Sequence, residues 1–140
     1  MTLKMRFRFS PTQDGLVKVL GPLETDIMEL LWKEKQGTVK QIHRTLQQRR
    51  DIAYTTVMTT MSRLAEKGIL FRTRDGLAYV YSPAITQDEF VHTFVQQVLD
   101  GLLDDFTDIT LEYVVDYLAR HDPTQLKRLS RDAQTRYARA

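Results

Sequence analysis

Residues 52–68 constrain the fold of this chain more than any other stretch. Three apolar residues, Val57, Met61 and Leu64, recur there at i, i+4 and i+7, which is the spacing of one buried face of an α-helix. A Lys-Gly pair at the end of the stretch is typical of a helix C-terminus. We therefore expect a helix over residues 54–67.

The face of this helix opposite the apolar stripe is rich in threonine. It carries Thr56, Thr59 and Arg63, with Thr55 beside them at the N-terminal end. Lys, Glu and Gln favour a solvated helix more than threonine does, so helix stability does not explain this surface. Short side chains let a helix approach base edges, and hydroxyl and guanidinium groups bind bases or phosphates. The face suits a helix that reads a DNA groove; the alternative is a core helix with a threonine-rich outer face of no function.

Two β-prone runs follow the helix directly, at residues 69–74 and 77–83. The Asp-Gly pair between them is typical of the turn of a tight hairpin, and Arg72 and Arg74 stand just before it. A helix followed at once by a basic hairpin is the plan of a winged helix-turn-helix domain. In such a domain the helix lies in the major groove, and the hairpin, or wing, contacts the backbone or the minor groove.

Five segments carry a specific resemblance to a known family. They are Leu20-Gly21-Pro22-Leu23-Glu24, Ile27-Met28-Glu29-Leu30-Leu31-Trp32, Ala53-Tyr54-Thr55-Thr56-Val57-Met58-Thr59, Arg63-Leu64-Ala65-Glu66-Lys67-Gly68 and Ala78-Tyr79-Val80-Tyr81-Ser82-Pro83. Together they resemble the penicillinase-repressor (BlaI/MecI/CopY) family of winged-helix repressors, strongly over residues 20–83 and in pattern only elsewhere. The resemblance implies a homodimeric transcriptional repressor that binds double-stranded operator DNA. The copper-responsive members carry a cysteine metal-binding motif, which this cysteine-free chain does not match.

This interpretation assigns particular side chains to the DNA. Base or base-edge contacts are expected from Thr55, Thr56, Met58, Thr59 and Arg63. Contacts to the DNA backbone, or by the wing, are expected from Thr38, Lys40, Tyr54, Lys67, Arg72, Arg74 and Tyr79. Met58 stands where some members of the family have a basic residue, so the operator need not be the family's usual TACA/TGTA type.

Two helices are expected before the threonine-rich one. The first begins at Pro22, a residue favoured at the first helical position, and runs to about residue 35. The second opens with a capping box formed by Thr38 and Gln41 and ends near residue 50. Within residues 1–20, the basic residues Lys4, Arg6 and Arg8 alternate with Met5, Phe7 and Phe9. We expect a flexible basic arm over residues 1–20, with an ordered strand beside the wing as the alternative.

Residues 84–140 are expected to form a three-helix dimerisation module, which makes the chain mainly α with a small β wing. A capping box at residues 86–89 opens the first helix, Asp108 or Thr110 the second, and Asp122-Pro123 the third. Fewer than about 60 residues enclose little core alone, so their apolar faces are expected to pair with those of a second chain. The alternative is that they fold back on the winged domain of the same chain. The dimerisation residues expected are Val91, Phe94, Val95, Val98, Leu102, Leu111, Val114, Val115, Leu118, Leu126 and Leu129.

The resemblance also implies a way to relieve repression. In the β-lactam-responsive members, a membrane-bound sensor metallopeptidase triggers cleavage of an Asn-Phe bond in the first C-terminal helix. The similar place here is Thr93-Phe94, where the phenylalanine is kept and the asparagine is replaced. Cleavage by a sensor-linked protease is one expectation, and induction without cleavage is the other.

The charges of the chain divide along its length. Residues 1–83 hold 14 basic and 8 acidic residues, a net charge of +6, whereas residues 84–140 hold 6 and 10, a net charge of −4. The basic part contains the helix and the wing, as expected of a protein that reads nucleic acid, since phosphate neutralisation supplies most non-specific affinity.

A second hypothesis keeps the winged fold but makes it a protein-protein interaction module, whose threonine face binds a partner protein. Binding of that partner would depend only weakly on salt.

Little in the sequence indicates an enzyme, a cofactor or a metal site. The histidines His43, His92 and His121 fall on three different expected helices without ligand spacing, and the acidic residues between 100 and 108 lack the spacing of a calcium loop. No apolar run approaches the roughly 18 residues that suggest a membrane span. We expect a cytoplasmic protein without membrane insertion.

Overall fold

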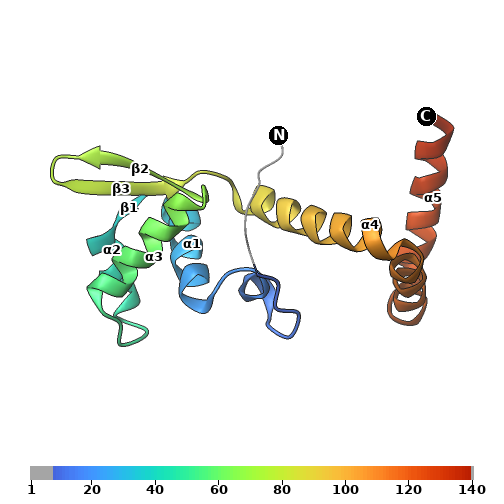
Figure 1. The fold of residues 1–140 in the computed structure, drawn as a ribbon, viewed down its shortest axis with the longest axis horizontal. Helices are drawn as coiled ribbons and strands as arrows, with labels where there is room; N and C mark the ends of the chain where they lie inside the picture. Colours follow the sequence, from blue (N-terminus) through green and yellow to red (C-terminus); the bar gives the residue numbers. More distant parts are fainter. Residues whose placement is uncertain (1–7, 140) are drawn as a thin grey trace. The chain divides into compact units, whose positions relative to one another are not determined.

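The threonine-rich stretch forms the predicted helix, α3 (Tyr54–Glu66), in the computed structural model, which describes residues 8–139 (Figure 1). The described chain consists of two compact units that divide between Val95 and Gln96. In the first unit the apolar stripe of α3 is fully buried, because it packs against the two helices before it and the strand after it.

Two helices precede α3, as the sequence predicts. Helix α1 (Pro22–Glu34) begins at the predicted proline, and the left-handed backbone of Lys35 (φ 78°) follows its last turn. Helix α2 (Val39–Leu46) begins with the predicted capping box. The backbone N–H of Gln41 donates to the Thr38 hydroxyl at 3.2 Å, and the backbone N–H of Thr38 donates to the Gln41 side-chain oxygen at 2.9 Å. Helix α2 ends earlier than expected, and turns follow it.

A three-stranded antiparallel sheet supplies the wing. Its order is β1-β3-β2, and β2 (Leu70–Asp75) and β3 (Ala78–Pro83) are the strands of the predicted hairpin. Gly76 takes the positive φ (64°) that a tight hairpin turn requires. Strand β1 (Gly37–Thr38), which pairs with β3, escapes sequence prediction because two residues are too few to show the alternation of a strand.

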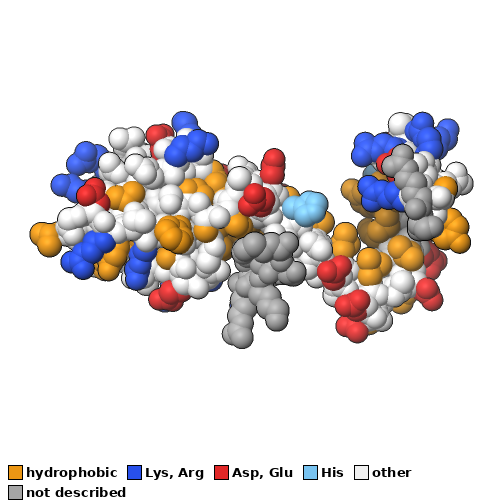
Figure 2. Space-filling view, turned by 90° about the horizontal axis from the view of Figure 1, so that it is seen from above, with side chains coloured by type: hydrophobic (Ala, Val, Ile, Leu, Met, Phe, Trp, Pro, Cys, Tyr) orange, Lys and Arg blue, Asp and Glu red, His pale blue; other side chains and the backbone are white. Residues whose placement is uncertain are grey.

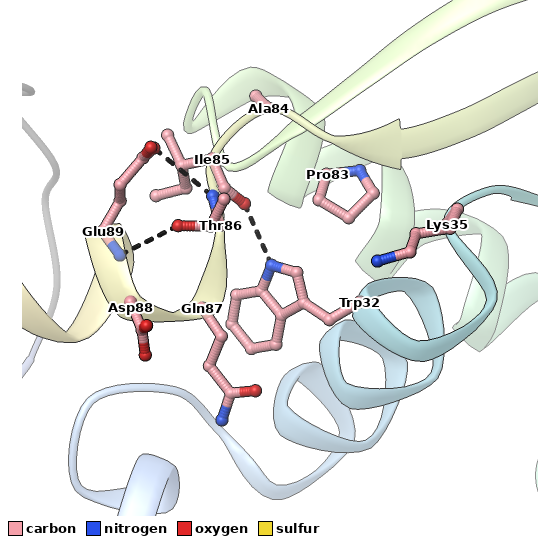
Figure 3. A pocket seen from close by; sticks show the side chains of 9 residues that line it. All are labelled: Trp32, Lys35, Pro83, Ala84, Ile85, Thr86, Gln87, Asp88 and Glu89. Carbon is pink, nitrogen blue, oxygen red and sulfur yellow. Dashed lines mark hydrogen bonds between the residues drawn. The ribbon is translucent and has the colours of Figure 1, made fainter.

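One hydrophobic core holds the first unit together, and the first turn of helix α4 (Gln87–His121) completes it. Phe90 on α4 is fully buried, and its ring centre lies 5.9 Å from that of Trp32 on α1. The indole N–H of Trp32 donates to the backbone oxygen of Ile85 at 3.0 Å (Figure 3). The buried apolar residues of this core are Val19, Leu20, Ile27, Met28, Leu30, Leu31, Val39, Ile42, Leu46, Val57, Met61, Leu64, Ile69, Leu70, Tyr81 and Phe90.

The prediction of a basic arm over residues 1–20 is wrong for its last part. Gly15–Lys18 form a short 3₁₀ helix, η1, and the next two residues, Val19 and Leu20, are buried in the core. The packing of η1 and these residues against α1 is a tertiary contact, which the pattern of alternating basic and apolar residues does not reveal. The beginning of the predicted arm, residues 1–7, lies outside the described residues.

The division between the two units falls inside α4 rather than at residue 83. Val91 and Phe94 are half-buried and pack against the core of the first unit. The first turns of α4 therefore follow the alternative in which this segment folds back on the winged domain of its own chain. A contribution of Val91 and Phe94 to dimerisation stays a prediction, and any such contact would have to share side chains that this core already uses.

The second unit contains the rest of α4 and helix α5 (Pro123–Arg139). Non-helical backbone at Phe106 (φ −132°, ψ 46°) divides α4 into two helical parts, close to the predicted start of the second C-terminal helix. Helix α5 follows the predicted cap, because the carboxylate of Asp122 accepts a hydrogen bond from the backbone N–H of Gln125 at 3.3 Å. The three expected helical segments are thus present, two of them within α4.

Many apolar side chains beyond residue 94 are exposed. On α4 the residues Val95, Leu99, Leu102 and Phe106 recur at i, i+4, i+7 and i+11, and each has between 40% and 57% of its surface exposed. The exposed predicted dimerisation residues farther along the chain are Leu111, Val115 and Leu129, with 52%, 47% and 49%. Such an apolar row at helical spacing is incomplete as a core, because each of its side chains keeps at least 40% of its surface exposed.

We expect Phe90→Ala to lower the free energy of unfolding of the first unit by about 3–5 kcal/mol, because it empties a fully buried aromatic site. Phe71→Ala is the matched control. Phe71 is 60% exposed on β2, and its loss should change stability by less than about 0.5 kcal/mol. Chemical denaturation of the full chain measures both values, and equal effects of the two substitutions would contradict the assignment of α4 to this core.

Candidate nucleic-acid interface

The outer face of α3 presents the predicted base-contacting residues to solvent. Their side chains, those of Thr55, Thr56, Met58, Thr59 and Arg63, are all exposed. No side chain caps the N-terminus of α3, which leaves backbone N–H groups of its first turn free of side-chain acceptors. Backbone N–H groups at a helix N-terminus bind anions such as phosphate.

The turn between α2 and α3 is held by a histidine to which the sequence assigned no role. A ring nitrogen of His43, Nε2, lies 2.9 Å from the backbone oxygen of Ile52, so it acts as the donor in this contact. The same ring meets the edge of the Tyr54 ring at a centroid distance of 5.5 Å. His43 thereby positions Tyr54, a predicted backbone contact that is 45% exposed. His43 is half-buried beside the apolar stripe of α2. Its spacing in the sequence does not distinguish it from a solvated histidine.

The wing turns one face toward α3. The register pairs Arg72 with Tyr81 and Arg74 with Tyr79, so these four side chains share a face of the hairpin. The Arg72 guanidinium lies 4.5 Å from the centre of the Tyr79 ring, and Tyr81 is its neighbour across the hairpin. The pKa of Arg72 is raised, chiefly by the interaction with the Tyr81 side chain, while desolvation acts in the opposite direction. The cross-strand register and the Tyr79 ring hold this positive charge in a defined position.

Helix α3 and the wing together line two adjoining grooves of about 380 and 440 Å³. Met58, Tyr79 and Tyr81 line both grooves. The first groove is otherwise lined by Thr59, Ser62, Arg63, Glu66 and Arg72, and the second by Thr38, Val39, Lys40, Tyr54, Leu77 and Ala78. Basic side chains gather at this end of the first unit, around the wing (Figure 2). Predicted contacts from four separate elements thus meet on one surface.

Three further predicted contacts lie on or near this surface without lining a groove. Thr55 and Thr56 are exposed in the first turn of α3, and Arg74 donates from Nε to the backbone oxygen of Gly76 at 3.2 Å, close to the tip of the wing. Lys67 differs from all of them, because its ammonium group forms an ion pair with Glu24 on α1 at 3.2 Å. The structure does not bring Lys67 together with the other predicted contacts.

The grooves also contain residues that the sequence did not single out. Tyr81 lines both grooves although only 2% of its surface is exposed. The alternation along β3, which places Tyr81 on the same face as Tyr79, was the signal in the sequence that could have identified it. Leu77, at the wing tip, is completely exposed, and Glu66 at the end of α3 adds a negative charge beside Arg72.

The residues that the structure describes contain no group of three His, Asp or Glu side chains close enough to hold a metal ion. Between residues 8 and 139 there is also no helix long and apolar enough to cross a membrane.

An exposed helix face beside a basic two-stranded wing defines the winged helix-turn-helix class of proteins. The family model of the penicillinase repressor matches residues 20–132, which is most of the chain, so this protein belongs to the penicillinase repressor family. The resemblance predicted from the sequence is confirmed, and so is the mainly helical fold with a small β wing.

Several proteins are similar to this chain over part of its length. The transcriptional regulator BlaI of Mycobacterium tuberculosis is 47% identical over 73 residues, which are 51% of this chain and 53% of that protein. The penicillinase repressor of Bacillus licheniformis is 24% identical over 88 residues, or 60% of this chain and 69% of that protein. The solved DNA-binding domain of the repressor BlaI covers 50% of this chain and 85% of that domain, at 24% identity and a TM-score of 0.46. The match to the mycobacterial relative thus spans about half of its length.

Proposed function

We propose that this chain is a transcriptional repressor that binds a pseudo-palindromic operator as a homodimer. The observation that carries the proposal is the single surface on which an uncapped, threonine-faced helix meets an arginine-bearing wing. Two relatives that bear the names of a transcriptional regulator and a penicillinase repressor support it.

On this proposal α3 lies in the major groove with Thr55, Thr56, Met58, Thr59 and Arg63 toward the bases. The exposed sulfur side chain of Met58 offers apolar contact where a basic residue would offer a hydrogen bond. Short hydroxyl side chains around it allow the helix axis to approach the base edges closely.

The wing and the start of α2 would hold the DNA backbone. Arg72, Arg74 and Tyr79 are the wing contacts, and Lys40 is exposed beside the N-terminus of α2. The Thr38 hydroxyl already accepts the capping hydrogen bond, so a phosphate there would meet a helix start that is fixed in advance. Lys67 would have to share its charge with Glu24, which makes it the weakest of the predicted backbone contacts.

A pseudo-palindrome requires two winged units in fixed relation, roughly one helical turn of DNA apart. The exposed apolar side chains beyond residue 94 support a dimer, because pairing with a second copy would remove them from water. The predicted dimerisation residues on this part of the chain are Val95, Val98, Leu102, Leu111, Val114, Val115, Leu118, Leu126 and Leu129.

Cleavage at Thr93-Phe94 is one proposed route of induction, and induction with the repressor intact is the alternative. The bond lies in helical backbone, where the Thr93 hydroxyl donates to the oxygen of Glu89 at 2.8 Å and the Phe94 ring lies 6.1 Å from that of Phe90. A sensor-linked protease would therefore need local unwinding of α4 before it reached the bond. A cut here falls just before the division at Val95, so it would detach the winged unit from the apolar module and leave it with monomer affinity.

We expect Arg63→Ala to weaken operator binding by about 1–3 kcal/mol and to relax the preference at one position of each half-site, if Arg63 reads a base. Selection from a random DNA pool measures both quantities for wild type and variant. Arg128→Ala is the control, because Arg128 is exposed on α5 and pairs only with Asp132. An unchanged affinity and motif in Arg63→Ala would remove Arg63 from the site.

The binding of the wild-type chain to operator DNA should weaken steeply as the salt concentration rises. Weak salt dependence would favour a protein-binding role of the threonine face.

We expect residues 1–95 alone to be a folded monomer that binds the operator roughly 10²–10⁴-fold more weakly than the full chain, since joining two winged units raises affinity through effective concentration. The matched control is residues 1–83, which lack Phe90 and should be less stable. Sedimentation and DNA titration test both fragments. A full chain that stays monomeric at micromolar concentration would overturn the two-fold arrangement.

Cleavage at this bond predicts a stable fragment that ends near Thr93 in induced cells, because the winged unit keeps Phe90 and most of its core after the cut. A blot of the repressor before and after induction is the measurement. Release of the target genes with the repressor still full length would exclude cleavage for this protein.

A further inference from the structure

The proposed DNA surface contains an acidic side chain that its function does not explain. Glu66, the last residue of α3, is the one carboxylate that lines either groove in the part of the chain that the structure describes. DNA repels a carboxylate, so a surface selected only for affinity would not carry one here. Helix stability does not explain the residue either, because a negative charge at the C-terminal end of a helix opposes the helix macrodipole.

Helical spacing places Glu66 in the middle of the exposed face of α3. Thr59, Ser62 and Glu66 stand at i, i+3 and i+7, and at roughly 100° per residue they point within about 60° of one another. The same spacing places them opposite the buried residues Val57 and Leu64. The exposed carboxylate of Glu66 therefore belongs to the surface that is proposed to face DNA.

The carboxylate lies between a predicted base contact and a predicted backbone contact. Glu66 lines the first groove together with Arg63 on α3 and Arg72 on the wing. The pKa of Arg72 is raised chiefly by the Tyr81 side chain and in smaller part by the negative charge of Glu66. Among residues 8–139, however, no basic nitrogen lies within 4 Å of the Glu66 carboxylate, so no ion pair neutralises it.

One strand of DNA has to cross this groove in the proposed complex. With α3 in the major groove and the wing on the backbone or in the minor groove, the sugar-phosphate strand between the two passes over the gap between α3 and the wing. Thr55 and Glu66 are separated by about 16 Å along the helix axis, whereas the major groove is about 12 Å wide. Because the N-terminal part of such a helix contacts the bases, Glu66 falls beside the phosphates of that strand.

We propose that Glu66 limits the affinity of each winged unit for DNA by repelling the phosphates of the strand that crosses the first groove. The inference rests on the proposed function and identifies a residue that acts against binding. Weak binding by one unit lets a separated unit leave the operator, whereas two joined units still bind through effective concentration. The carboxylate thereby makes repression depend on the joining of two units.

A base contact is the other role open to this carboxylate. Carboxylates accept a hydrogen bond from the amino group of cytosine in the major groove, which would add to affinity and to sequence preference. The neighbouring Arg72 and the position of Glu66 at the C-terminal end of α3 favour the phosphate strand instead. The two roles predict opposite effects on operator binding when the charge is removed, so one substitution separates them.

The substitution Glu66→Gln in the full chain removes the charge and keeps the size of the side chain. The variant should bind a half-site duplex about two- to fivefold more tightly than wild type, and a full operator about four- to 25-fold more tightly, because two units contribute there. Both duplexes carry the sequence that the wild-type chain selects from a random pool. A scrambled duplex of equal length should also be bound more tightly, and every gain should shrink as salt rises, since salt screens the repulsion.

Two further variants are the controls. Glu66→Asp keeps the charge and should bind DNA as wild type does. Glu29→Gln makes the same change in net charge on α1, where Glu29 is exposed and lines neither groove, and should change the affinity much less. Thermal unfolding of each variant checks that these exposed substitutions leave the fold intact.

The outcomes separate this role of Glu66 from its competitors and from the proposed function. Wild-type affinity in Glu66→Gln, or a gain no larger than that of Glu29→Gln, would overturn the inference, and so would a gain that salt does not reduce. Weaker operator binding with a relaxed preference at one base position would assign Glu66 to base reading instead. A wild-type chain that selects no sequence from the pool would remove the proposed function together with the inference, whereas a clear operator motif confines a failure to Glu66.

Discussion

Burial of one face of α3 is the interaction on which the candidate interface depends. Val57, Met61 and Leu64 have no exposed surface, because α1, α2 and β2 close over them. A helix held in this way cannot rotate about its axis without exposing its stripe to water, which costs free energy in proportion to the apolar area uncovered. The same packing that stabilises the domain therefore fixes the direction in which the threonines and Arg63 point.

The wing is tied to the same core through Tyr81. Tyr81 is buried and stands opposite Arg72 in the hairpin, so the position of a charged wing residue follows from the packing of the core. Phe90 and the contact of Trp32 with Ile85 extend the core beyond the wing into α4. The packing of the core therefore also sets the positions of the interface residues, and a substitution at Tyr81 would disturb both.

The second unit differs from the first in how much of its apolar surface it buries. Its helical segments expose many large apolar side chains, whereas the first unit exposes few of its own outside the wing and α3. In the proposed homodimer, pairing with a second copy would remove these side chains from water. The division inside α4 gives each unit its own source of stability, which suits a repressor whose two halves are proposed to separate on induction.

The sequence by itself determined the helices, the hairpin and the residues of the α3 face. Helical spacing, two capping boxes and the Asp-Gly turn are local signals, and local backbone preferences decide them. Tertiary structure alone decided the burial of Val19 and Leu20, the pairing of β1, the ion pair of Lys67 with Glu24 and the roles of His43 and Phe90. Each of these is a contact between residues whose partners lie elsewhere in the chain, and neither spacing nor propensity specifies which distant side chain will be the neighbour.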